Sequence, residues 1–190
     1  MCPRRMLQVV TLGALVVLCT GCSGVRLRPD GTPEPQDCPR QTLEAMARMG
    51  LYPGDSFPVV MDERLGVASK ARLEEGSVVG YVDRPYEQLP EGTRLFGQVW
   101  TAGEMVIIRY DAIQVPAGHR MPLCAEVDDS GGQEKDPASP KGVAIIQDNV
   151  GVVKVVTRYG EHDFSKDRGR VYIYRTIEDL PPKVRKKLKP

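Results

Sequence analysis

Histidine is the side chain best suited to proton transfer near neutral pH, and this sequence contains two, His119 and His162. His162 stands between Glu161 and Asp163, and a histidine beside a carboxylate can serve in general acid–base catalysis. However, the sequence has no GxSxG, SxxK or HExxH motif to supply a nucleophile or a zinc site. We therefore expect both histidines to lie in exposed loops, and we expect a protein that is not an enzyme.

Acidic side chains gather in one polar stretch, at Asp128, Asp129, Glu134 and Asp136. Carboxylate oxygens are the ligands that calcium prefers, so this cluster is a candidate metal site. Its spacing does not match the EF-hand pattern, and glycines and a lysine interrupt it. We interpret the stretch as a solvated loop, and we expect no metal and no cofactor.

The first 21 residues have the layout of an export signal. Arg4 and Arg5 precede an apolar run over residues 6–18. This run is shorter than the roughly 20 residues that a membrane-spanning helix needs. It is typical of a secretory signal peptide.

The segment ends in Leu18-Cys-Thr-Gly-Cys22, which resembles the bacterial lipobox, although Cys19 stands where that motif usually has leucine. The resemblance implies that Cys22 carries lipid and becomes the first residue of the mature chain, anchoring it to a membrane without spanning it. Ser23 in the next position resembles the signal for sorting to the outer membrane. An ordinary signal peptide cut nearby is the alternative.

Three cysteines remain after such processing: Cys22, Cys38 and Cys124. With lipid on Cys22, the other two form a pair in an oxidising compartment, where disulfides persist. A disulfide between them would close a long loop and stabilise the fold by about 3–4 kcal/mol. Two free thiols, or a thiol nucleophile, are the other interpretations, but no CxxC motif is present.

Charge and composition set the domain organisation. Of 26 basic residues, Arg4 and Arg5 leave with the signal, so 24 basic and 25 acidic residues remain, a balance that predicts no nucleic-acid partner. Proline and glycine dominate residues 22–39, which predicts an extended, solvated tether. We expect one β-rich domain over residues 40–180. The basic end, residues 181–190, either meets anionic lipid or is a solvated terminus.

The strongest structural signal is a β-hairpin formed by residues 93–100 and 105–115. Apolar side chains alternate over the second strand, and the alternation changes phase after Asp111. A β-bulge at Asp111–Ala112 would keep one face buried, because one extra residue reverses which side chains point inward. Residues 116–118, Pro-Ala-Gly, then form a turn.

Other segments predict a mainly β fold, a small barrel or sandwich with one short N-terminal helix. The helix is expected over residues 40–49, with Gly50 as its stop. Further strands are expected at residues 57–61 and 78–82, and a second hairpin at 143–146 and 150–159.

Aromatic residues are the candidates for contact with a partner. Trp100 is the single tryptophan, at the end of a predicted strand, and Tyr110 lies in the next strand. Tyr172 and Tyr174 share one face of a later predicted strand. We predict a partner surface at these four residues, with packing in the core or on the sheet as the alternative.

One stretch resembles a known family. Leu89-Pro-Glu-Gly-Thr-Arg-Leu-Phe-Gly97 is similar to an apolar-Pro-x-Gly-Thr-x-Leu-x-Gly motif of the VirB10/TrbI family, and Ile113-Gln-Val-Pro-Ala-Gly118 is similar to its I-x-x-Pro-x-Gly motif. The resemblance spans about residues 54–123. It implies a β-barrel that binds envelope proteins of a type IV secretion channel. A lipoprotein signal stands where that family has a cytoplasmic tail and a transmembrane helix.

These observations predict a non-catalytic lipoprotein of the bacterial envelope, anchored in the outer membrane and facing the periplasm. We expect it to be an assembly or scaffold module that binds other envelope proteins through sheet edges and the hairpin of residues 93–115. The alternative is a lipid-anchored protein that captures a small molecule or a glycan, in a concave pocket lined by the four aromatic residues.

Overall fold

The computed structural model describes residues 24–68, 70–127 and 133–160. It is mainly β, as predicted, and contains a closed six-strand barrel with a single short helix among these residues. The predicted signal peptide, Cys22, Tyr172, Tyr174 and the basic tail lie outside the described residues. The elements are β1 (Gln36–Asp37), α1 (Arg40–Arg48), β2 (Ser56–Val60), β3 (Ala71–Glu74), β4 (Gly76–Tyr81), β5 (Arg94–Trp100), β6 (Met105–Gln114), β7 (Met121–Val127), β8 (Gln133–Glu134), β9 (Val143–Ile146), β10 (Val150–Val155) and β11 (Arg158–Tyr159).

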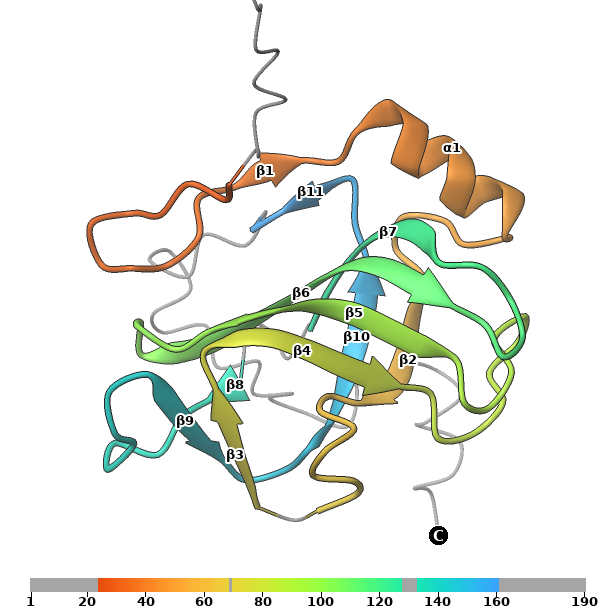
Figure 1. Cartoon of the computed structure of the whole chain (residues 1–190). Helices are drawn as coiled ribbons and strands as arrows, with labels where there is room; N and C mark the ends of the chain where they lie inside the picture. Colours follow the sequence, from red (N-terminus) through yellow and green to blue (C-terminus); the bar gives the residue numbers. More distant parts are fainter. Residues whose placement is uncertain (1–23, 69, 128–132, 161–190) are drawn as a thin grey trace, which may run out of the picture.

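The barrel strands follow the order β5-β4-β2-β10-β7-β6, and pairing of β6 with β5 closes the circle. All of these pairings are antiparallel. In Figure 1, β4, β5 and β6 run side by side across the front, and β2 and β10 cross behind them. Because the barrel is closed, β4, β5 and β6 have no long free edge. Most of the sheet edges that were predicted as a contact surface are therefore paired within the barrel.

The predicted hairpin is confirmed, including its bulge. Phe96 pairs with Ala112 and Gly97 pairs with Tyr110, so Asp111 is the extra residue. Because of this bulge, Tyr110 and Ile113 are both buried although three positions separate them. A side chain on Gly97 would overlap the backbone of Arg109, which explains a glycine opposite the bulge.

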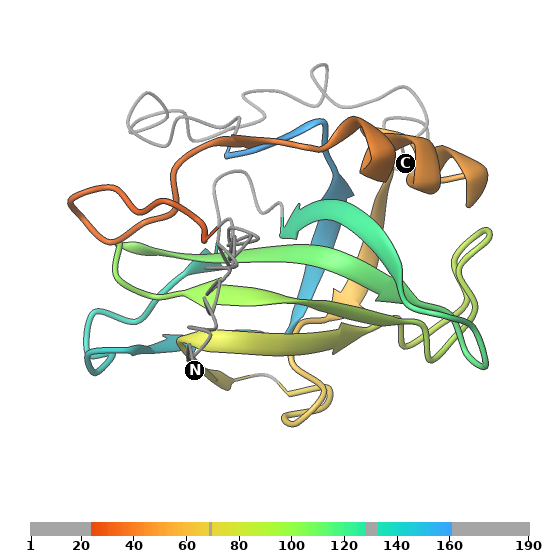
Figure 2. The ribbon, with the colours of Figure 1, turned by 45° about the horizontal axis from the view of Figure 1, so that its top comes forward.

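The helix α1 packs over β7 and covers one side of the barrel (Figures 1 and 2). Met46 is fully buried and lies against the backbone of Cys124. The helix ends at Arg48, and Gly50 is the predicted stop: its φ of +74° allows Leu51 to donate its N–H to the Met46 carbonyl.

The predicted hairpin of residues 143–146 and 150–159 is wrong. β9 pairs with β3 in a separate two-stranded ribbon, and β10 joins the barrel between β2 and β7. The link between them turns at Asn149, which is buried and binds the loop after β2: its amide donates to the carbonyls of Asp62 and Gly66, at 2.9 and 2.6 Å. β3 itself was not expected as a strand.

The predicted solvated tether over residues 22–39 is also wrong for its described part. Strand β1 pairs with β11, Thr32 and Cys38 are buried, and Leu27 forms a β-bridge with Pro33. We call residues 24–39 the N-terminal strap. The strap lies against the barrel and covers side chains on its outer surface.

Candidate functional site

The predicted aromatic partner surface is wrong for two of its four residues. Tyr110 is fully buried, and its hydroxyl crosses the barrel to donate to the Met61 carbonyl at 3.0 Å. Gly80 leaves the space for it, since a Cβ there would lie 2.7 Å from the Tyr110 hydroxyl oxygen. Trp100 is only 4% exposed. Neither side chain can meet a partner or line an open pocket.

Trp100 packs against a buried arginine, Arg109. Arg109 is 5% exposed, and its guanidinium carbon lies 5.6 Å from the ring of Trp100 and 5.2 Å from that of Tyr159. It donates to the carbonyls of Glu34 at 2.9 Å and Pro33 at 3.4 Å, which belong to the strap.

The charge of Arg109 is opposed by burial, which lowers its pKa from the ordinary value, and is supported by Glu126 with 3.9 Å between Nε and Oε2. The ion pair connects β6 with β7, and the two hydrogen bonds to strap carbonyls hold residues 33–34 on the barrel.

The predicted cysteine pair is a second connection between the strap and the barrel, in addition to Arg109. Cys38 and Cys124 form a disulfide with a Cα–Cα distance of 6.2 Å, across 86 positions of sequence. Both residues are buried beside α1 and β7.

The candidate catalytic and metal residues are not brought together in the described part of the chain. His119 is exposed in the turn after β6, and His162 lies outside the described residues. Among residues 24–68, 70–127 and 133–160, no three His, Cys, Asp or Glu side chains are grouped so as to hold a metal ion.

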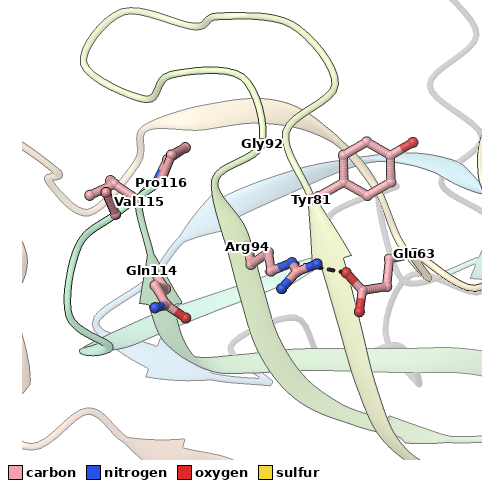
Figure 3. A pocket seen from close by; sticks show the side chains of 8 residues that line it. Glu63, Tyr81, Gly92, Arg94, Gln114, Val115 and Pro116 are labelled. Carbon is pink, nitrogen blue, oxygen red and sulfur yellow. Dashed lines mark ion pairs between the residues drawn. The ribbon is translucent and has the colours of Figure 1, made fainter.

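The structure adds a site that the sequence did not indicate, a groove of about 620 Å³ on the outside of the barrel (Figure 3). Its floor is a row of three side chains on neighbouring strands: Arg94 of β5 is opposite Gln114 of β6 on one side and Tyr81 of β4 on the other. Residues directly opposite in antiparallel strands point to the same face, so the three lie in one line.

An acidic side chain completes the polar floor. Glu63 lies 3.1 Å from Arg94, Oε2 to Nε, and its own N–H donates to the Val79 carbonyl on β4. The side chains of Arg94 and Glu63 are 58% and 34% exposed, so both remain accessible to a ligand. The pair carries no net charge.

One wall of the groove is the turn of residues 115–117. Gly118 donates its N–H to the Val115 carbonyl, and the Gln114 amide donates to the Gly118 carbonyl, each at 2.9 Å. Ala117 has a φ of +59°, a conformation that non-glycine residues seldom adopt. The turn therefore gives the groove a fixed, partly apolar wall.

Comparison with family models finds no match for this chain, and a search among curated proteins finds no related sequence. In the described part of the chain, no helix has the length and apolar character needed to cross a membrane.

Two buried tyrosines should make the fold less stable at alkaline pH. Burial raises the pKa of Tyr110 and of Tyr159 above the ordinary 10.0. Only the unfolded chain therefore releases these protons near pH 10. The contribution of the two tyrosines to the free energy of unfolding is complete below that pH and is lost progressively above it. The loss should be roughly 1.4 kcal/mol per pH unit for each tyrosine.

We expect Tyr110→Phe to reduce this slope by about half, measured by urea unfolding between pH 9 and 11. Tyr52→Phe is the control for loss of a tyrosine hydroxyl on the surface, because Tyr52 is 56% exposed. Equal slopes for Tyr110→Phe and the unmodified protein would contradict the burial of an uncharged hydroxyl.

Proposed function

We propose that this protein is a non-catalytic lipoprotein of the bacterial envelope that acts as an assembly or scaffold module. Lipid on Cys22 would anchor it in the outer membrane, facing the periplasm. The lipobox-like sequence before Cys22 and the disulfide between Cys38 and Cys124 support an exported protein, because disulfides persist in oxidising compartments.

The observation that carries the scaffold proposal is the filled interior of the barrel. Every barrel strand contributes to one continuous core that includes Phe57, Leu95 and Tyr110. Barrels of eight strands are just wide enough for side chains or one small ligand, and six strands enclose less. The lumen is thus occupied by core residues, which leaves the outer surface for binding. The filled lumen supports binding of a protein partner over capture of a small molecule inside the barrel.

The contact surface that we propose is the hairpin surface, the exposed side chains of residues 93–115. It includes Gln98 on β5 and Asp111 at the bulge of β6. The VirB10/TrbI-like stretch, residues 54–123, runs from just before β2 into β7 and so includes this hairpin. Envelope proteins of a secretion channel are accordingly the partners that we propose.

The strap sets the distance of the barrel from its anchor. Arg26, four residues after Cys22, is already held in the strap, because its carbonyl accepts the Glu34 N–H at 2.8 Å, and a residue spans at most about 3.5 Å. A lipid on Cys22 would therefore hold the barrel close to the membrane surface.

Replacing Cys22 with alanine tests the anchor. Without a thiol to modify, the protein should move almost completely from the membrane fraction to the soluble periplasmic fraction, or remain unprocessed. Fractionation with immunoblotting measures this, and Cys2→Ala is the control, because Cys2 lies in the predicted signal peptide and its loss should keep the mature protein on the membrane. Membrane retention of the Cys22→Ala protein in processed form would contradict lipid anchoring.

Chemical crosslinking of the mature protein in its own envelope, followed by affinity purification and mass spectrometry, tests the scaffold. We expect envelope-complex subunits among the crosslinked products. Recovery of the protein with no crosslinked partner would contradict the proposal.

A further inference from the structure

The floor of the groove, which lies at one end of the hairpin surface, has a chemistry that protein contacts at Gln98 and Asp111 do not require. Tyr81, Arg94 and Gln114 end in an aromatic ring, a planar guanidinium and a planar amide, set in one row across three strands. Adjacent strands lie about 4.8 Å apart, so the row presents a polar or aromatic group at regular intervals. This spacing suits an extended ligand with repeating hydroxyl groups.

The charges of the floor argue against an anionic ligand. Glu63 neutralises Arg94 at 3.1 Å, and an approaching carboxylate or phosphate would meet the Glu63 carboxylate as well as the guanidinium. A hydroxyl group has no such conflict, because it donates to the carboxylate and accepts from the guanidinium. The Gln114 amide can do both.

The remaining surfaces suit the apolar faces of a sugar. The Tyr81 ring offers an apolar face together with a hydroxyl group, and residues 115–117 give a wall of aliphatic side chains. A volume of about 620 Å³ lies within the range of ligand sites, about 300–1,000 Å³. The side chains that line the groove lie on the outside of the barrel (Figure 3).

We propose that this groove binds an uncharged glycan strand, with Arg94, Glu63 and Gln114 binding hydroxyl or amide groups and Tyr81 stacking on a sugar ring. This activity goes beyond the scaffold role and does not depend on the lipid anchor. It also lies away from Trp100 and Tyr110, where the sequence had suggested a pocket.

Titration of the mature chain with an uncharged oligomer of N-acetylglucosamine, followed by calorimetry, tests the proposal. Arg94→Ala and Gln114→Ala should each weaken binding about tenfold, since each removes hydrogen bonds to the ligand. Arg72→Ala is the matched control, because Arg72 is an exposed arginine on β3 and should bind like the unmodified protein.

Glu63→Gln separates a binding role from a structural one. It frees the positive charge of Arg94 and keeps a side chain that can hydrogen-bond hydroxyl groups, so affinity for the uncharged oligomer should change less than about threefold while affinity for an anionic oligogalacturonate should rise about tenfold. Backbone NMR shifts at residues 81, 94 and 114 on adding the uncharged oligomer would place the ligand in the groove. The proposal is overturned if the oligomer does not bind at millimolar concentration, if it binds equally to Arg94→Ala and Gln114→Ala, or if the unmodified protein prefers the anionic probe.

Discussion

Removing the disulfide by changing Cys38 and Cys124 to alanine should lower the free energy of unfolding by about 4 kcal/mol. The disulfide closes a loop across 86 positions, so the unfolded chain gains much freedom without it. It also ties the strap and α1 to β7, beside the buried Met46. Since small domains are stable by only about 5–15 kcal/mol, the loss is a large fraction of the total.

Urea unfolding measures this change, with Cys22→Ala in both proteins so that no third thiol interferes. Dithiothreitol supplies the control: it should destabilise the protein that retains Cys38 and Cys124 by a similar amount and leave the double variant unchanged. A difference below about 1 kcal/mol, or mass mapping that finds both thiols free under non-reducing conditions, would contradict the structural role of the disulfide.

Changing Arg109 to methionine should cost about 3 kcal/mol and should loosen the strap selectively. Methionine keeps much of the apolar contact with Trp100 and Tyr159 but makes none of the hydrogen bonds. The carbonyls of Pro33 and Glu34 then lose their donors, and Glu126 loses a cation beside it. Limited proteolysis should cut residues 24–35 faster than in the unmodified protein.

Arg158→Met is the matched control for this experiment. Arg158 also contacts the strap, through Asp37 at 3.1 Å, but the two side chains are 50% and 78% exposed. An exposed ion pair of this kind contributes less than about 1 kcal/mol. Equal losses of stability and equal rates of strap cleavage in the two variants would show that burial of Arg109 has no special effect.

The local features of the fold could be predicted because each depends on a few adjacent residues. The change of apolar phase after Asp111 indicated the bulge, and Gly50 indicated the end of the helix. The paired cysteines followed from a count of the thiols that would remain if residues 1–21 were removed as a signal peptide. Strand pairing between distant segments has no such local signal, and the pairing of β9 with β3 was therefore missed.

The strap shows how tertiary packing overrides composition. Residues 22–39 have the proline and glycine content of a linker, yet their described part packs on the outside of the hairpin, where the carbonyls of Pro33 and Glu34 accept hydrogen bonds from the buried Arg109. In the sequence, Arg109 looks like an ordinary outward-facing polar residue of a strand. An arginine close to a tryptophan in the same hairpin is the one signal that could have indicated a covered site.

The groove could not be predicted because its residues come from four separate places in the chain. Tyr81, Arg94 and Gln114 each stand at the end of a predicted strand, and only the strand register puts them in one row. Glu63 lies in the loop after β2, and its approach to Arg94 depends on the pairing of β2 with β4 and of β4 with β5. Residue type alone gave no reason to group them.

The scaffold role is tested most directly by photo-crosslinking from single positions in living cells. A photoreactive residue at Gln98 or Asp111 reports on the hairpin surface, and one at Arg72 on β3 reports on another part of the surface. We predict that positions 98 and 111 capture the same envelope protein and that position 72 does not. Capture of no protein from either hairpin position, or the same products from all three, would contradict a partner-binding hairpin.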